Sequence, residues 1–287
     1  MKIAVTTASG NLGGAIINHL KHKIGAENVI GIARTPEKAK FLGVEIRKGD
    51  YNNKEDFNKA LKNVDALLLV SNMDYPDKRI QQHRNVIEAA KENGVKKIVY
   101  TSIIGAEKGN GFSPVVQSNR QTEEDIRNSG LQWAIGRDGL YIEPDLEYIE
   151  TYKKDGAIIN SAAEGKCGYT SRKELVFAYY HLLMDDKLNR GTYNLLGEPV
   201  TQMQLVHAIN KSYNLNLDYK IISVESFTKQ RQAALGEFLG TVIGGIYEGI
   251  STGKFDGKSD FLEVAKRTHK SLKEMINDFI CQKNFKK

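Results

Sequence analysis

The stretch KIAVTTASGNLGG, residues 2–14, is a short apolar strand that runs into a glycine-bearing turn and then into a helical pattern. A strand that ends at a helix N-terminus aims free backbone N–H groups and the positive end of the helix dipole at one point, which suits a pyrophosphate. In dinucleotide-binding units the end of the second strand contacts the adenosine ribose, and here Arg34 stands about twenty residues beyond the loop. The stretch therefore predicts a dinucleotide site.

The glycine pattern of this loop is incomplete. Thr7 stands where the full pattern has its first glycine, the residue that eases the strand-to-helix turn. Gly10 would permit close backbone approach and Gly13 close packing of helix on strand, and the hydroxyls of Thr6, Thr7 and Ser9 are expected to donate to phosphate oxygens. The alternative is a plain strand-turn-helix in which the glycines serve only the turn.

Apolar runs of strand length alternate with helical patterns as far as Arg137. Strands are expected at 3–5, 29–33, 44–46, 66–70, 98–101 and 133–135, and helices at 12–23, 35–42, 54–62, 77–93 and 118–129. Such alternation is typical of a parallel sheet with helices on both faces. We expect a Rossmann-type, doubly wound α/β fold.

The pattern changes after residue 137. Short strands are expected at 157–159, 193–195 and 217–222, and helices at 172–184, 201–213, 227–249 in pieces and 261–280. The pair Gly244-Gly245 and its apolar neighbours, Leu239, Val242, Ile243 and Ile246, are interpreted as packing within the second half. We expect residues 1–137, with about 156–196 returning to the sheet, to form the NAD(P)-binding domain. Residues 138–155 and 197–287 would form a smaller, mainly helical substrate-binding lobe.

Composition narrows the classes of protein that the chain can represent. Its 41 basic and 35 acidic residues are interleaved along 287 residues, so a nucleic-acid partner is not expected. Cys167 and Cys281 lie far apart in the sequence and do not have the spacing of metal ligands, so we predict neither a disulfide framework nor a metal site. A reducing cytoplasm is the simplest location for a chain with so few cysteines. Thr6 interrupts the first apolar run, and the run 66–70 is too short to span a bilayer, so neither a signal peptide nor a membrane partner is expected.

Basic residues beyond the second strand bear on the choice of cofactor. A guanidinium at Arg34 can bind a 2′-phosphate with two parallel hydrogen bonds, and Lys38 on the following helical turn can assist. A carboxylate at this position would repel that phosphate. We therefore expect NADPH, with NADH as the weaker alternative, although Arg34 also has a plain interpretation as a solvated residue.

Polar residues follow the other strands at the edge where ligands of such sheets bind. Asp50 and Tyr51 follow the third strand, Ser71 and Asn72 the fourth, and Thr101 ends the fifth; a turn or capping role is the alternative for the first two pairs. The predicted cofactor-binding residues are Thr6, Thr7, Ser9, Gly10, Asn11, Leu12, Arg34, Lys38, Asp50, Tyr51, Val70, Ser71, Asn72 and Thr101.

The residues that would carry out proton transfer are less well defined. Classical short-chain dehydrogenases use a Tyr-x-x-x-Lys pair on the helix after the fifth strand, and the nearest register here is Asn119-x-x-x-Glu123. That pair cannot act as a phenol and ammonium couple, so alcohol oxidation by that mechanism is not expected. Asp138 and Tyr141, after the sixth strand, are the candidates to line a substrate pocket, with corner packing between the lobes as the alternative.

Several segments together resemble the NmrA-like atypical short-chain dehydrogenase/reductases, and within them the NAD(P)H-dependent quinone oxidoreductase and triphenylmethane reductase group. The segments are Gly10–Gly13, Ile32–Ala39, Gly49–Tyr51, Gln82–Ala90 and Thr122–Gly130. The resemblance implies NADPH bound at residues 6–13, Arg34, Asp50, Tyr51 and the 71–72 region, and a flat aromatic acceptor between the cofactor and the helical lobe. It also implies direct hydride transfer, which depends on positioning more than on a general acid.

Two departures from that family pattern bear on function. Thr7 replaces the first glycine, and Asp138 stands where relatives carry a neutral asparagine. The leading hypothesis is a cytoplasmic reductase, monomeric or homodimeric, that transfers hydride from NADPH to a quinone-like or other flat aromatic acceptor. The alternative is a non-catalytic NADP(H)-binding redox sensor of NmrA type. An isomerase or sugar-nucleotide enzyme is disfavoured, because such enzymes usually keep the tyrosine-lysine pair.

Overall fold

A seven-stranded, all-parallel sheet forms the centre of the molecule, in a computed structural model that describes residues 1–284. The strand order is β11-β6-β5-β4-β1-β2-β3. The strands are β1 (Ile3–Val5), β2 (Val29–Ala33), β3 (Glu45–Lys48), β4 (Ala66–Leu69), β5 (Lys97–Ile103), β6 (Gln132–Asp138) and β11 (Thr192–Leu195). The order reverses between β1 and β4, which is where such sheets bind ligands.

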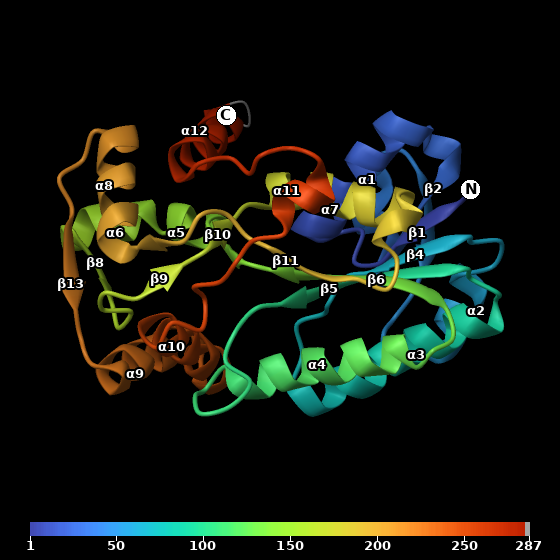
Figure 1. Cartoon of the computed structure of the whole chain (residues 1–287), viewed down its shortest axis with the longest axis horizontal. Helices are drawn as coiled ribbons and strands as arrows, with labels where there is room; N and C mark the ends of the chain where they lie inside the picture. Colours follow the sequence, from blue (N-terminus) through green and yellow to red (C-terminus); the bar gives the residue numbers. More distant parts are fainter. Residues whose placement is uncertain (285–287) are drawn as a thin grey trace.

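Helices cover both faces of the sheet, as Figure 1 shows. α1 (Asn11–Ile24) and α7 (Arg172–Met184) pack on one face, and α2 (Lys54–Ala60), α3 (Pro76–Glu92) and α4 (Ser113–Arg127) on the other. Each face has its own buried apolar core, because inner strands such as β1, β2 and β4 are buried along their whole length. The predicted doubly wound fold is confirmed.

Two helical segments of this part differ from the prediction. The segment expected to be a helix at 35–42 is a 3₁₀ helix, η2 (Pro36–Leu42), and the Thr35 side chain makes no capping hydrogen bond. The helix expected at 118–129 begins earlier, at Ser113, because Pro114 occupies its first turn and the Asn110 side chain accepts the Ser113 N–H at 3.0 Å. Five more residues of α4 therefore lie beside the ends of the strands.

The second lobe lies beyond the carboxyl ends of the strands, at the left of Figure 1. Its helices are α5 (Glu143–Glu147), α6 (Ile149–Asp155), α8 (Gln202–Tyr213), α9 (Val224–Leu235), α10 (Glu237–Ser251) and α12 (Leu272–Asn284). Short pairs, β7 (Leu140–Tyr141) with β10 (Tyr169–Thr170) and β9 (Lys166–Cys167) with β12 (Val200–Thr201), complete it. The predicted range 197–287 ends on three residues that lie outside the described part.

Two segments of the second half depart from the sequence interpretation. Within 156–196, expected to return to the sheet, β11 joins it, whereas β8 (Ala157–Asn160) pairs with β13 (Asp218–Ile221) in a separate two-stranded sheet. The helix expected at 261–280 is two helices, α11 (Phe261–Ala265) and α12, because Lys266 adopts a left-handed backbone with φ 57° and ends the first. The boundaries of the two predicted domains remain a prediction.

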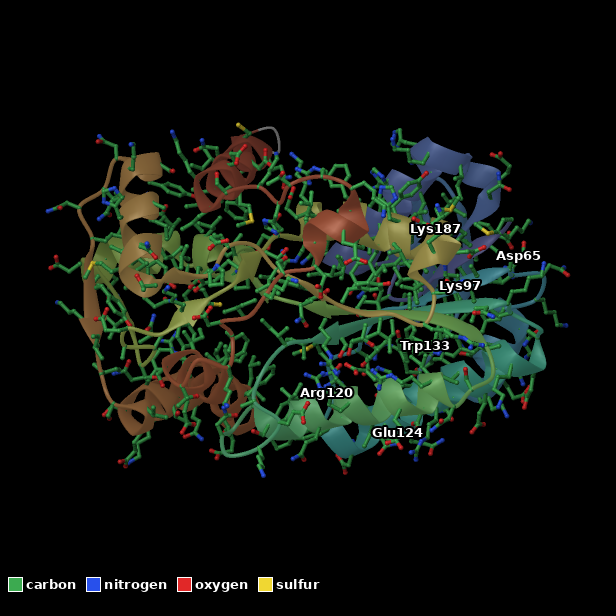
Figure 2. All side chains as sticks on the ribbon, viewed as in Figure 1. Asp65, Lys97, Arg120, Glu124, Trp133 and Lys187 are labelled. Carbon is green, nitrogen blue, oxygen red and sulfur yellow. The ribbon has the colours of Figure 1, made fainter. Side chains whose placement is uncertain are left out.

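The end of the sheet farthest from the second lobe carries charges that are paired locally. Figure 2 shows Asp65 and Lys97 at this end. Lys97 Nζ lies 3.4 Å from the Asp186 carboxylate, and Lys96 Nζ lies 3.1 Å from that of Asp65.

Candidate cofactor and substrate site

A cavity of about 720 Å³ lies at the carboxyl ends of the strands, between the sheet and α10. This volume is in the range of sites for small molecules and cofactors. The cavity brings together all of the predicted cofactor-binding residues, namely Thr6, Thr7, Ser9, Gly10, Asn11, Leu12, Arg34, Lys38, Asp50, Tyr51, Val70, Ser71, Asn72 and Thr101. The two catalytic candidates, Asp138 and Tyr141, line its other end.

The loop after β1 brings the N-terminus of α1 to the cavity wall. Thr7 adopts φ 51°, the left-handed conformation that the missing glycine would take without strain, and its carbonyl accepts the Gly10 N–H at 2.8 Å. A Cβ at Gly13 would lie 2.5 Å from the Thr7 carbonyl oxygen, so this glycine is required where α1 crosses the loop. The first turn of α1 has no acidic residue and no side-chain cap, which leaves the N–H groups of Asn11 and Leu12 free at the cavity wall.

The Thr6 hydroxyl has a different role from the predicted one. Its Oγ accepts the Val70 N–H at 2.8 Å and lies 2.7 Å from the Tyr51 hydroxyl, which also donates to the Val70 carbonyl. The Thr6 hydroxyl in turn donates to the Leu68 carbonyl at 3.4 Å, so Thr6 joins the ends of β1 and β4 and its proton is already used within the protein. The Thr7 and Ser9 hydroxyls have no partner among the described residues and remain available.

Two cations stand free at one end of the cavity. Arg34 and Lys38 are exposed, and neither side chain has a hydrogen-bond or ion-pair partner in the part of the chain that the structure describes. Asp50, beside them, accepts the Asn52 N–H at 2.9 Å and so also fulfils the turn role given as its alternative. The two free cations give this end of the cavity a positive charge that could bind an anionic group.

A buried arginine under the cavity has no counterpart in the sequence prediction. Arg79 on α3 is 3% exposed, and it donates to Ser118 Oγ at 3.0 Å, to Asn119 Oδ1 at 3.2 Å and to the Ser71 hydroxyl. These partners are neutral, and burial lowers the pKa of the guanidinium. Arg79 Nε has no partner among the described residues. The site therefore holds a positive charge that an anionic ligand would compensate.

The end of β4 offers an unused acceptor. Asn72 Oδ1 is buried without a hydrogen-bond partner, whereas its amide nitrogen contacts Gln82. Next to it, the Ser71 N–H donates to Thr101 Oγ1 at 2.8 Å, which fixes the backbone of this loop. A buried unpaired oxygen is costly, so a ligand hydroxyl or amide at this point would be stabilised.

Asp138 and Tyr141 form the polar part of the opposite end. The Tyr141 hydroxyl donates to Asp138 Oδ2 at 2.6 Å, and the Tyr179 hydroxyl donates to Oδ1 at 2.6 Å. Burial raises the pKa of Asp138 to about 7, because these hydroxyls offset only part of the desolvation of the carboxylate. The Arg172 guanidinium lies 5.8 Å from the centroid of the Tyr141 ring.

Helix α10 supplies the apolar wall facing these groups. Its residues Leu239, Val242, Ile243 and Ile246, interpreted from the sequence as lobe packing, line the cavity. Val242 and Ile246 also pack in the core of the second lobe, and Gly245 lies close to α4, since a Cβ there would lie 2.1 Å from the Phe112 backbone nitrogen. The close approach of α10 to residue 112 thus turns its apolar side chains toward the cavity.

The position of the usual tyrosine-lysine pair is occupied by a structural network. Asn119 Oδ1 accepts the Tyr100 hydroxyl at 2.6 Å, and Glu123 binds Ser102 Oγ at 2.6 Å and the Arg137 guanidinium at 2.7 Å. Glu123 is fully buried and is not among the residues that line the cavity. Neither residue provides a phenol or an ammonium group for proton transfer.

The sheet, the phosphate loop and the free cations define a dinucleotide-binding α/β protein. The family model described as NAD(P)H-binding matches residues 7–164. The chain is 32% identical to quinone oxidoreductase 2 of Escherichia coli, over 78% of this chain and 79% of that protein. It therefore belongs to the NAD(P)H-binding oxidoreductase family, as an NAD(P)H-dependent reductase, and the predicted family and cofactor class are confirmed.

Solved structures of similar proteins agree with this assignment. Citrobacter sp. triphenylmethane reductase complexed with NADP(H) has a TM-score of 0.88 and 32% identity, covering 96% of this chain and 99% of that one. The E. coli NADPH-dependent quinone oxidoreductase complexed with NADPH has a TM-score of 0.89 and 28% identity, covering 97% and 99%. Among the described residues, no helix has the length and apolarity needed to cross a membrane, and no cluster of three potential metal ligands occurs.

Proposed function

We propose that this protein uses NADPH to reduce quinone-like or other flat aromatic acceptors. The observation that carries the proposal is the division of one cavity into two ends. Free N–H groups and cations gather at one end, and the Tyr141 ring and the apolar face of α10 gather at the other. The similarity to a quinone oxidoreductase and a triphenylmethane reductase supports the same chemistry.

The residues at the cation-rich end fit a phosphorylated dinucleotide. The first turn of α1 would hold the pyrophosphate, and Arg34 with Lys38 the 2′-phosphate. The unpaired Asn72 Oδ1 would accept a hydrogen bond from the nicotinamide half, near the buried charge of Arg79. Asn72 Oδ1 and Arg79 Nε have no partner among the described residues, so each could be satisfied by a bound dinucleotide.

The acceptor end supplies positioning and a proton source. Bound NADPH supplies a hydride, and a quinone that takes up this hydride and one proton becomes the hydroquinone. The apolar side chains of α10 exclude water from the acceptor and hold it flat. Tyr141, hydrogen-bonded to Asp138, can pass a proton to the reduced oxygen and regain it from the carboxyl group, whose pKa is about 7.

Turnover with quinones is the direct test of this proposal. Purified protein, NADPH and a panel of benzoquinones and naphthoquinones should give quinone-dependent loss of the NADPH absorbance. Oxidation no faster than the enzyme-free background with every acceptor would contradict the catalytic function. If NADPH bound tightly in calorimetric titration without any turnover, the redox-sensor alternative would be supported instead.

Arg34→Ala should weaken NADPH binding selectively. Loss of a charge-assisted interaction of about 1.5–3 kcal/mol corresponds to roughly ten- to hundredfold in Kd, with little change for NADH, which lacks the 2′-phosphate. Calorimetric titration with both dinucleotides measures this difference. Lys40→Ala is the matched control, because Lys40 is an exposed cation on the 3₁₀ helix that follows Arg34 and does not line the cavity. Equal losses for NADPH and NADH would refute the proposed contact.

We also propose a cytoplasmic protein, monomeric or homodimeric, whose residues 138–155 and 197–287 bind the acceptor. Cys167 is buried and Cys281 exposed, and both are free thiols, which suits a reducing compartment. The lining of the acceptor end by α10 and by Tyr141 supports the assignment of this lobe to substrate binding.

A further inference from the structure

A second cavity of about 250 Å³ lies inside the helical lobe and adjoins the first. Three residues, Tyr141, Ile243 and Ile246, line both cavities, so the two spaces meet at the acceptor end of the main site. Its walls come from α5, α6, α9 and α10 and from the strands β7 and β8, and they include aromatic side chains such as Tyr148 and Phe227. A ligand in the main cavity can therefore extend a substituent between these helices.

The polar groups of the second cavity differ in whether they are already satisfied. Asp145 is 5% exposed, accepts the Tyr152 hydroxyl at 2.9 Å and the Tyr247 hydroxyl at 3.2 Å, and has a pKa raised by burial. Its hydrogen bonds are thus made within the protein, and its tendency is toward the neutral acid. Asp155, at the end of α6, is exposed to solvent.

Arg231 is the unsatisfied group of this cavity. Of the described residues that line it, Arg231 is the one cation, and its Nε is buried without a hydrogen-bond partner. The guanidinium lies 5.3 Å from the centroid of the Phe227 ring, a contact that orients its plane while leaving its N–H groups available. A half-buried guanidinium beside an aromatic wall is suited to a carboxylate or sulfonate attached to an aromatic body.

We propose that the second cavity is a substituent site that selects aromatic acceptors carrying an acidic group, which Arg231 binds. The inference rests on the proposed reductase function and specifies its substrate class. The reacting ring would lie in the main cavity, and the substituent would pass Tyr141 and Ile243 to place its acidic end at Arg231. Cationic or uncharged acceptors would use the main cavity alone.

The test compares three acceptors with one reacting ring: a naphthoquinone, the same quinone with a carboxylate-ended alkyl chain, and the methyl ester of that acid. The protein without substitutions should have a KM for the acid that is at least tenfold below its KM for the ester. Arg231→Gln should raise the KM for the acid by about ten- to hundredfold, the range for a lost charged hydrogen bond, and leave the unsubstituted quinone unchanged. Arg231→Lys should restore part of the preference for the acid.

Lys229→Gln is the matched control, because Lys229 lies on the same helix, pairs with Glu225 in solvent and does not line the cavity. One outcome would overturn the substituent site and leave the reductase function standing. In that outcome the unsubstituted quinone is reduced, the KM values for the acid and the ester are equal, and Arg231→Gln changes neither KM. If no quinone is reduced, the reductase function fails by itself. Calorimetric titration of the NADPH-loaded protein with the acid then decides the site, since binding lost in Arg231→Gln supports it and no binding overturns it.

Discussion

Gly13→Ala should lower NADPH affinity by at least about tenfold and destabilise the fold by roughly 1–3 kcal/mol, the usual cost of overpacking. A methyl group at this position would lie 2.5 Å from the Thr7 carbonyl oxygen and 2.8 Å from that of Thr6. Both atoms belong to the backbone, so α1 must move away from the loop. That movement displaces the free N–H groups of Asn11 and Leu12 from the phosphate position.

Gly14→Ala is the matched control for this effect. Its added methyl group would meet the Ala8 carbonyl oxygen at 3.2 Å and a Leu42 methyl at 3.8 Å, contacts that small adjustments can accommodate. Alanine also favours a helix over glycine by up to about 1 kcal/mol, so this variant should match the natural sequence in stability. Urea unfolding and NADPH titration measure both effects. Equal behaviour of the two variants would show that the crossing of α1 over the loop does not control the site.

The central fold could be predicted because its signals are local. A buried parallel strand such as β4 is a continuous apolar run, and helical periodicity between the strands leaves few other topologies. The errors in the predicted secondary structure occur where contacts with distant parts of the chain determine the local structure. The residues of η2 have helical propensity but form a 3₁₀ helix, and β8 finds its partner β13 some sixty residues later in the chain, a pairing that no local pattern encodes.

The residues of the site also divide into those that local sequence patterns predict and those that depend on tertiary contacts. The residues that end strands or follow the phosphate loop were predictable, because strand topology alone brings them to one edge. Arg79 was not predicted, since an arginine on an amphipathic helix usually faces solvent, and its burial depends on Ser118 and Asn119 of α4 and on Ser71 after β4. The role of Thr6 also depended on a partner, Tyr51, forty-five positions away. The lining face of α10 required the placement of the second lobe.

Asp138 departs from the family's asparagine, and its environment limits the consequence of the change. Asp138 is 2% exposed, and among the described residues its carboxyl group has two hydroxyl donors and no cation within hydrogen-bond distance. Because burial outweighs these two hydrogen bonds, the pKa of Asp138 is raised to about 7. Below that pH it is neutral, as asparagine would be. Above that pH the acceptor end gains a negative charge, which opposes the charge that develops on a quinone during hydride transfer.

Asp138→Asn should therefore stabilise the protein in a pH-dependent way. Between the unfolded pKa, about 3.9, and the folded pKa of about 7, the native state holds a proton that the unfolded state has lost, so the free energy of unfolding falls by about 1.4 kcal/mol per pH unit. Above pH 7 both states are ionised and the penalty stays constant at about 4 kcal/mol. Asparagine does not titrate, so the advantage of the variant should grow by roughly 2–3 kcal/mol between pH 5 and pH 8.

Urea unfolding of both proteins at pH 5 and pH 8 measures this difference, and Asp256→Asn, at an exposed loop position, is the control that should show no such change.

The negative charge of ionised Asp138 should also lower the rate of hydride transfer. For the natural sequence kcat/KM with an uncharged quinone should fall as the pH rises through about 7, whereas the variant should have a flatter profile. Parallel pH profiles of stability and of kcat/KM in the two proteins would mean that Asp138 stays ionised throughout. The hydroxyls of Tyr141 and Tyr179 would then be sufficient to stabilise a buried carboxylate beside the acceptor.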